Sequence, residues 1–171
     1  IIKDIHSIIK KMPDVNLIVK LHPIQLRHND DLKSLFHEID PTIPVYLWTS
    51  VIDLINSCDA VVVISPEGFG TSTMILESLI LEKPTVNIVV DNKVYDFEHV
   101  KENAILTISE KDDLQGNLQA ILFNDELRKR LTQNGRTFVE TFLANAGSAS
   151  ECLAQTLHDP KQFKNPKESI N

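Results

Sequence analysis

Apolar residues along the chain follow two alternating spacings, one typical of helices and one typical of strands. Helical spacing occurs in residues 1–12, 31–39, 51–57, 74–81 and 111–123. Short apolar or β-branched runs lie between these segments, in residues 16–21, 44–48, 60–64, 85–90 and 104–108. Residues 125–157 are predicted to form one long helix or two shorter ones, interrupted near residues 145–147. This alternation predicts an α/β fold, a Rossmann-like open parallel sheet with helices on both faces.

The run of residues 60–64, Ala-Val-Val-Val-Ile, shows no polar alternation and predicts a central strand covered by helices on both sides. Residues 1–158 are expected to form a single domain. Residues 159–171 are rich in Pro, Lys and Asn and should form a loosely ordered tail. The helical pattern starts at Ile1, without an initiator Met or a capping residue. We therefore expect the chain to be a fragment that lacks an N-terminal domain.

Composition narrows the classes of partner. The 171 residues are 42% hydrophobic, which is enough for one domain with its own core. The formal net charge of −7 argues against binding long nucleic acid, which requires a clustered basic face. Cys58 and Cys152 match no metal or disulfide spacing, and we expect buried free thiols in a reducing, cytoplasmic compartment. No apolar run approaches the roughly 20 residues that span a bilayer.

Ligands of open parallel sheets bind beyond the carboxyl ends of the strands, so the loops after the predicted strands are the places to search. The first predicted strand ends in Lys20-Leu21-His22-Pro23. Pro23 forces the chain out of the strand and leaves His22 at the edge of the sheet. The imidazole there could donate a hydrogen bond to a phosphate, or it could simply bond to a neighbouring loop.

A second candidate lies where the strand of residues 60–64 leads through a loop with two glycines into the next helix. Thr71, Ser72 and Thr73 place three hydroxyls at the start of that helix, where unpaired N–H groups and the positive end of the helix dipole favour an anion. Simple N-capping is the structural alternative. Glu77 lies one turn further along the same side, where its carboxylate could accept both hydroxyls of a ribose. Its structural alternative is a solvent-facing charge.

Other residues with functional chemistry give weaker signals. Trp48, the single tryptophan, ends the second predicted strand and could flank a base, or it could belong to the core. His28, His37 and His158 are expected on the surface, whereas His99 could approach the site from a long loop. No histidine shows metal-ligand spacing with carboxylates or cysteines. We therefore expect neither a metal nor another cofactor.

The order and spacing of several segments resemble the C-terminal domain of GT-B-type transferases, and most of all the CDP-glycerol glycerophosphotransferase and capsule-polysaccharide group. The resemblance covers roughly residues 1–158 and includes Lys-Leu-His-Pro at 20–23, Asp-Leu-Ile-Asn-Ser-Cys-Asp-Ala-Val-Val at 53–62, Ser-Thr-Met-Ile-Leu-Glu at 72–77, Lys-Pro-Thr at 83–85 and the segment 142–150. It implies that His22, with Ser72 and Thr73, holds the phosphates of a nucleotide-linked donor. It also implies that Glu77 faces the ribose.

By this resemblance, the chain is the donor-binding half of a transferase that moves a glycosyl or glycerophosphate group from a CDP-, CMP- or UDP-linked donor in cell-surface polysaccharide biosynthesis. Such enzymes close two Rossmann-like domains over the donor, and the N-terminal one usually presents the acceptor and the catalytic base. No catalytic residue is therefore assigned in this chain, and the fragment alone is expected to be inactive. The full-length protein could attach peripherally to the inner face of the cell membrane. Two alternatives remain, an enzyme like the UDP-GlcNAc 2-epimerases and a non-enzymatic flavodoxin-like binding domain.

Overall fold

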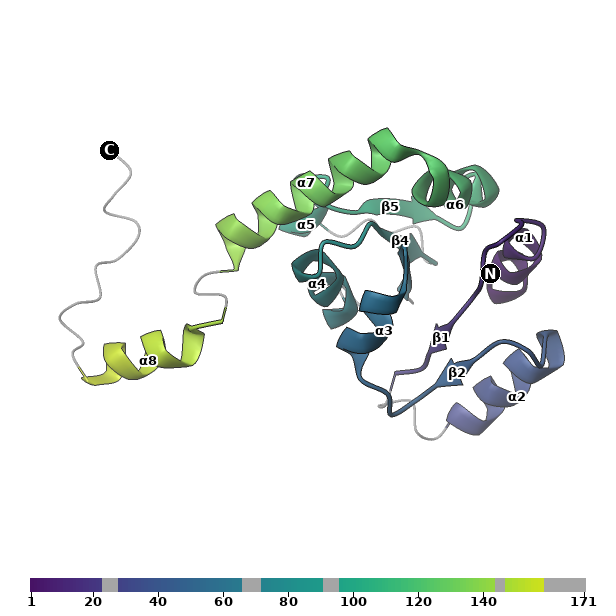
Figure 1. Ribbon diagram of the computed structural model, residues 1–171, viewed down its shortest axis with the longest axis horizontal. Coiled ribbons are helices and arrows are strands. Elements are labelled where there is room, and N and C mark those ends of the chain that lie inside the picture. Colours follow the sequence, from purple (N-terminus) through teal and green to yellow (C-terminus); the bar gives the residue numbers. More distant parts are fainter. Residues whose placement is uncertain (23–27, 66–71, 91–95, 144–146, 159–171) are drawn as a thin grey trace.

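The computed structural model describes residues 1–22, 28–65, 72–90, 96–143 and 147–158. Helices and strands alternate along most of this length (Figure 1). The helices are α1 (Ile2–Ile9), α2 (Asn29–Ile39), α3 (Val51–Ser57), α4 (Thr73–Ile80), α5 (Glu98–Lys101), α6 (Leu114–Phe123), α7 (Asp125–Phe142) and α8 (Ala149–His158). The strands are β1 (Val19–Lys20), β2 (Val45–Tyr46), β3 (Val61–Ser65), β4 (Thr85–Val89) and β5 (Leu106–Ser109). All five predicted strands are present, and the short α5 is an addition that the sequence did not predict.

The main sheet has three parallel strands in the order β3-β4-β5. Every residue of β4 is buried, whereas Val62 in β3 is 36% exposed. The predicted central strand, β3, therefore lies at one edge of this sheet, and β4 occupies its centre. The polar Thr85 and Asn87 concealed this in the sequence, because they interrupt the apolar pattern of the most buried strand.

Strands β1 and β2 form a separate parallel pair. The amide of Val19 donates to the carbonyl of Pro44, and the amide of Leu21 to that of Tyr46, both at 2.9 Å. Across the described residues, no β-ladder joins this pair to the three-stranded sheet. The open sheet predicted from the sequence is thus divided into two parts, with two-residue strands in the smaller part.

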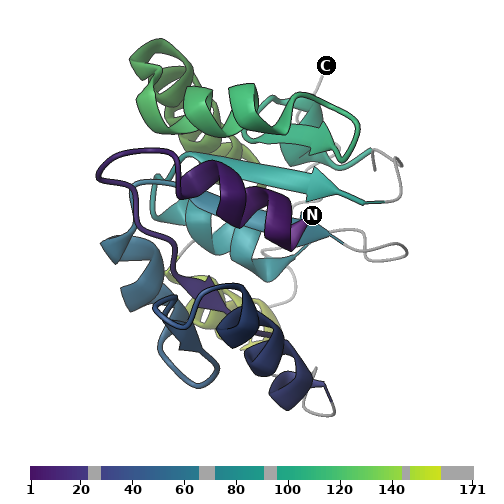
Figure 2. The same cartoon turned by 90° about the vertical axis from the view of Figure 1, so that its right-hand side faces the viewer.

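Helices cover both faces of the three-stranded sheet, which confirms the predicted layering. Helix α1 lies in front of the sheet in Figure 2, and the core on this face joins Ile5 and Ile9 of α1, Ile88 of β4, and Leu118 and Ile121 of α6. The second core lies on the opposite face, between the sheet and helices α3, α4 and α7. Val61 and Val63 of β3 belong to this second core, whereas Ile64 packs against the first, as the alternation of side chains along a strand requires.

Helices α4 and α7 pack closely in the second core. A Cβ atom built on Gly135 of α7 would lie 2.9 Å from Cδ2 of Leu79 in α4. Ile75 of α4 is 0% exposed, and Phe138 of α7 belongs to the same core. Because glycine has no side chain, α7 can approach α4 and hold it against the sheet.

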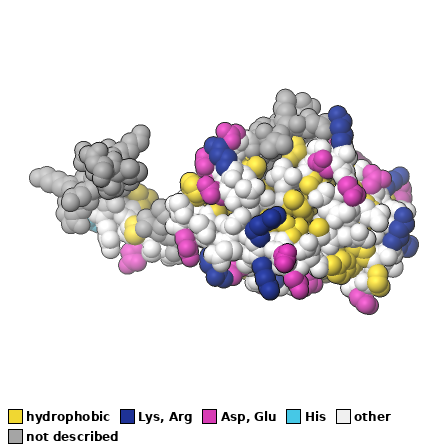
Figure 3. All heavy atoms as spheres, turned by 90° about the horizontal axis from the view of Figure 1, so that it is seen from above, with side chains coloured by type: hydrophobic (Ala, Val, Ile, Leu, Met, Phe, Trp, Pro, Cys, Tyr) yellow, Lys and Arg dark blue, Asp and Glu magenta, His cyan; other side chains and the backbone are white. Residues whose placement is uncertain are grey.

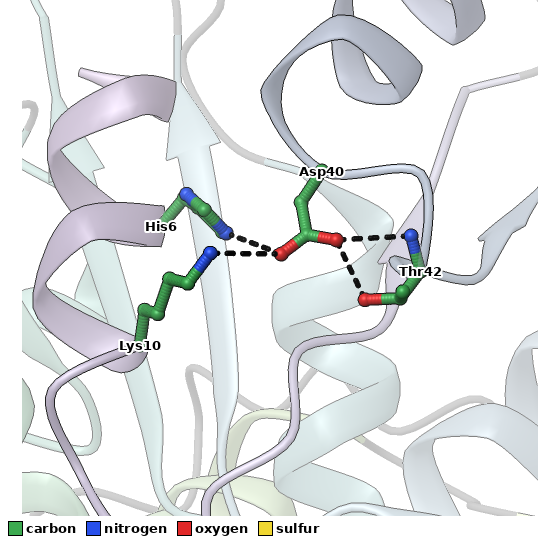
Figure 4. A network of polar contacts seen from close by, with 4 residues as sticks. All are labelled: His6, Lys10, Asp40 and Thr42. Carbon is green, nitrogen blue, oxygen red and sulfur yellow. Dashed lines mark hydrogen bonds and ion pairs between the residues drawn. The ribbon is translucent and has the colours of Figure 1, made fainter.

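A polar network on the other side of the molecule ties α1 to the turn between α2 and β2 (Figure 4). The Asp40 carboxylate accepts hydrogen bonds from the Thr42 hydroxyl at 2.6 Å and from the Thr42 amide at 3.0 Å. Its other oxygen lies 3.2 Å from Nε2 of His6 and 3.6 Å from Nζ of Lys10. The bonds from Thr42, with that from His6, hold the pKa of Asp40 far below its usual range.

The sequence left open whether residues 125–157 form one long helix or two shorter ones, and the structure shows two, α7 and α8. Gly147 precedes α8 and has a φ of +85°, a conformation that favours glycine. Helix α8 contains no buried residue and extends away from the rest of the molecule in Figures 1 and 3. On the face of the molecule that Figure 3 shows, acidic and basic side chains are interspersed. The predicted tail at residues 159–171 lies outside the described residues.

Candidate functional site

The carboxyl end of β1 and the start of α4 supply the described residues of the predicted site. All pairings in the structure are parallel, so the strands of each sheet end at one edge. Helix α4 follows β3, after a loop outside the described residues that includes Thr71. Ser72 and Thr73 begin the helix from that side, and His22 follows β1. Ligands of α/β sheets bind at this kind of edge.

The first turn of α4 combines a cap with an accessible hydroxyl. Oγ of Ser72, the N-cap residue, accepts a hydrogen bond from the Met74 amide at 3.3 Å. The capping role that the sequence left open is therefore observed for Ser72. Thr73 is exposed, and the first turn contains no acidic residue. Nothing in this turn opposes an anion at the helix N-terminus, where N–H groups and the dipole attract negative charge.

His22 lies on the surface directly after the buried Leu21. Leu21 is 5% exposed, and its amide makes the last backbone bond of the β1–β2 pair, to Tyr46. The backbone is therefore fixed immediately before His22. The imidazole can reach solvent at the edge of the strand pair, as a ligand-binding side chain must.

Lys20 is a residue of this edge whose importance the sequence analysis missed. Its Nζ donates to the carbonyl of Leu21 at 2.8 Å and to the carbonyl of Leu47 at 2.9 Å. Burial lowers the pKa of Lys20, and the nearby Glu77 carboxylate opposes that shift by raising it. Glu77 is half-buried on α4, one turn after Thr73. The Glu77 carboxylate of α4 is thus close enough to the end of β1 to act on the pKa of Lys20.

A sequence signal for Lys20 did exist. It interrupts an otherwise apolar run, Leu-Ile-Val-Lys-Leu, at the end of a strand. A charged side chain at such a position either reaches solvent or must find polar partners. Here it finds two backbone carbonyls.

Trp48 is 73% exposed, so the interpretation as a core residue is wrong. It lies between the end of β2 and Ser50, the residue that caps α3. Ile52, on the first turn of α3, is also exposed, at 55%. The indole is thus available to a ligand at the same edge as His22, and its role beside a base stays a prediction.

A buried polar pair supports the sheet close to the start of the loop that leads to α4. The Ser65 hydroxyl, at the end of β3, donates to Oδ1 of Asn87 in β4 at 2.7 Å. Ser65 is 4% exposed and Asn87 5%. Thr107 of β5 lies opposite Asn87 in the ladder, and among the described residues its buried hydroxyl has no hydrogen-bond partner. These groups lie within the packed layer and are therefore placed to fix the strand ends rather than to contact a ligand.

His99 and the two cysteines differ from the sequence-based expectations. His99 is 4% exposed, stacked on Phe97 and edge-on to Phe138, and burial lowers its pKa. It is therefore a core histidine of α5 and does not approach the site. Cys58 and Cys152 are free thiols, as expected, but both are partly exposed rather than buried.

A shallow hollow of about 580 Å³ lies at the opposite, amino-terminal edge of the sheet, between the end of α4 and the start of α7. Two of its three cations, Lys83 and Arg128, bond to backbone carbonyls. Lys83 donates to the carbonyls of Asn56 and Cys58, and Arg128 to those of Ile121 and Leu122. Asp59, Glu82 and Asp125 also line it. Because two of its three positive charges cap helix ends and carboxylates surround it, the hollow suits an anionic nucleotide less well than the start of α4.

Among the residues that the structure describes, no three His, Cys, Asp or Glu side chains come together as a metal site. Within the same residues, no helix is both long and apolar enough to cross a membrane.

Comparison with known proteins gives one informative likeness. No family model matches the sequence, and no curated protein matches it significantly. The structure is similar to the crystal structure of WaaG, described as a glycosyltransferase involved in lipopolysaccharide biosynthesis, with a TM-score of 0.52 and 17% sequence identity. The match covers 90% of this chain and 49% of that one, so this chain spans about half the length of the solved structure. The likeness confirms the predicted fold, a Rossmann-like half of the GT-B type.

Proposed function

We propose that this chain binds the nucleotide-linked donor of a GT-B transferase that builds cell-surface polysaccharide. The observation that carries the proposal is the pairing of an exposed histidine at the carboxyl end of β1 with the capped, acid-free first turn of α4. The end of β1 brings Lys20 and His22, α4 brings its N-terminus and Glu77, and the Glu77 carboxylate acts on the pKa of Lys20. Positive charge and N–H donors beside a carboxylate suit a ligand that carries both phosphates and a ribose.

In this proposal the phosphates lie between His22 and the first turn of α4. The imidazole and the helix N-terminus would stabilise the negative charge that develops on the nucleotide as it leaves the transferred group. The Glu77 carboxylate would accept hydrogen bonds from the ribose hydroxyls, and Trp48 would lie beside the base. The acceptor and a catalytic base would come from a second Rossmann-like domain, so the present chain alone should not transfer the group.

The likeness to a lipopolysaccharide glycosyltransferase supports the transferase class. The resemblance to GT-B transferases implies that a second half would close over the donor. The motif resemblance at 20–23 and 72–77 favours a CDP-, CMP- or UDP-linked glycosyl or glycerophosphate group. A cytoplasmic site, at the inner face of the membrane, would give such an enzyme access to its donor.

Calorimetric titration of the chain with UDP, CDP, CMP and ADP tests the proposal. We expect a pyrimidine nucleotide to bind with a dissociation constant no tighter than the high micromolar range, because one domain buries only part of the ligand. His22→Ala should cost about 1.5–3 kcal/mol of binding free energy if the imidazole bonds a charged phosphate. The matched control is His37→Ala on α2, an exposed histidine that should leave binding unchanged. No heat with any nucleotide at millimolar concentration would refute the proposal.

Two further variants separate the phosphate from the ribose. Ser72→Ala combined with Thr73→Val should weaken nucleoside diphosphates and spare the plain nucleoside, whereas Glu77→Gln should weaken the nucleoside and spare inorganic pyrophosphate. Loss of the Ser72 cap should also cost about 0.5–2 kcal/mol of stability. Asn124→Ala, which removes the cap of α7, controls for this, because it should lower stability without changing pyrophosphate affinity.

A further inference from the structure

The side chain of Lys20 bonds to the backbone of two neighbouring segments, one at the end of β1 and one just after β2. Its two acceptors are the carbonyls of Leu21 and Leu47, at 2.8 and 2.9 Å. Leu21 directly precedes His22, and Leu47 directly precedes Trp48. One ammonium group therefore bridges the backbone just before both candidate ligand residues.

The bridge continues a very short ladder. Strands β1 and β2 pair over two residues each, and the last backbone bond runs from the Leu21 amide to the Tyr46 carbonyl. The bond from Nζ to the Leu47 carbonyl adds a cross-strand link one residue further on. Within the described residues, the backbone bonds between the two segments end before His22 and Trp48, and the bond from Lys20 is the next link between them. The side-chain contact of Lys20 therefore adds to the sheet pairing in fixing the backbone just before these two side chains.

The electrostatic surroundings keep the ammonium in place. Burial lowers the pKa of Lys20, and the Glu77 carboxylate raises it. Charge-assisted bonds to carbonyls are stronger than neutral ones, so a charged Lys20 holds both segments more firmly than a neutral polar side chain would. The Glu77 carboxylate on α4 therefore opposes the loss of charge that burial favours at Lys20.

We infer that Lys20 is a positioning residue, which fixes the separation and orientation of His22 and Trp48 by bridging the backbone in front of each. Its importance for ligand binding rests on the proposed function, whereas its effect on the two residues in the free protein does not. Lys20 acts here through the backbone and is not itself a ligand of the phosphate.

The test compares Lys20→Met with Lys83→Met. Lys83 is a closely matched control, because its Nζ also bridges two backbone carbonyls, those of Asn56 and Cys58 at 3.0 and 2.8 Å, at the opposite edge of the sheet. In the nucleotide-free protein, ¹⁵N relaxation at His22 and Trp48 and the fluorescence anisotropy of the single tryptophan report local order. Lys20→Met should lower the order of both residues, and Lys83→Met should leave them as in wild type. Unchanged order in Lys20→Met, or an equal loss in both variants, would overturn the inference.

The ligand arm uses the same two variants and UDP or CDP. Lys20→Met should raise the dissociation constant about tenfold, the lower end of what supporting contacts contribute at ordered sites, and Lys83→Met should not change it. A tenfold loss without any change in the free protein would make Lys20 a direct phosphate ligand and overturn the positioning role. Unchanged affinity together with lost order would overturn its importance for binding. Failure of the wild type to bind any nucleotide would instead refute the proposed function, while the relaxation result would still decide the bridge.

If Lys20→Met does not fold, the wild-type protein supplies a second measurement. Because burial lowers the pKa of Lys20, it should lose its proton before exposed lysines as the pH rises. The amide signals of His22 and Trp48 should shift together along that titration. Titration of Lys20 without movement of these signals would contradict the inference.

Discussion

Replacing Ile75 by alanine tests whether α4, which carries the candidate site, is anchored by the core beneath it. The side chain of Ile75 is 0% exposed among the residues of β3, α3 and α7 that form the second core. Ile80 is the matched control, because it lies on the same helix and is 52% exposed. The two substitutions change helix propensity by the same amount and differ in burial.

The magnitude follows from the carbons removed. Ile→Ala deletes three carbon atoms, worth about 2.4 kcal/mol at roughly 0.8 kcal/mol each when fully buried. A residual cavity brings the expected cost at Ile75 to about 3–4 kcal/mol. At Ile80, half of the transfer term is absent and no cavity forms, so the cost should be about 1.2 kcal/mol or less. The pair should therefore differ by about 2–3 kcal/mol.

Urea unfolding monitored by circular dichroism measures this difference directly. A loss of about 3 kcal/mol should also lower the melting temperature by roughly 6–12 °C in a domain of this size. Equal losses for the two variants would show that α4 is not packed as described. A loss at Ile80 larger than that at Ile75 would reverse the assignment of the buried face.

Three further predictions concern stability. Asp40→Asn should destabilise the protein near about pH 7, measured by urea unfolding, because a carboxylate with a depressed pKa stabilises the fold above its ordinary value. The difference from wild type should begin to shrink only as the pH falls below that ordinary value, and most of it should remain near about pH 3, since the folded-state pKa lies far lower. The wild-type protein should lose stability as the pH falls from about 7 to 5, because burial lowers the pKa of His99 and the unfolded chain takes up the proton more readily. His99→Phe should remove that part of the loss, and an unchanged dependence of unfolding free energy on pH would contradict the burial of His99. Gly135→Val should cost about 1–3 kcal/mol by overpacking against Leu79, and a stabilised variant would show that α7 and α4 are not in close contact.

The sequence predicted most of the fold because the helix and strand periods are strong. Residues 51–57 form α3 as expected, and β4 and α4 differ from prediction by one residue at their ends. The relation between strands was harder to predict, since pairing depends on contacts between segments distant in sequence. Thr85 and Asn87 made the most buried strand appear less central than β3. The division of the sheet into two ladders has no local signal at all.

The site was predicted in part for a similar reason. Local spacing singled out His22, Ser72, Thr73 and Glu77, whose role at a ligand stays a prediction, but it could not show that Lys20 would turn back onto two carbonyls. That arrangement depends on β2 lying beside β1. Trp48 showed the opposite limit, because a lone aromatic residue at a strand end fits the core and the surface equally well until packing decides.

The most direct test of the nucleotide site is an NMR titration of the ¹⁵N-labelled chain with UDP and CDP. The account predicts that the largest shifts fall on His22, on the first turn of α4 at Ser72 and Thr73, and on the indole of Trp48. Residues that line the hollow at the opposite edge, such as Lys83 and Arg128, should not respond. Saturable shifts confined to that hollow, or no shifts at millimolar nucleotide, would contradict the account.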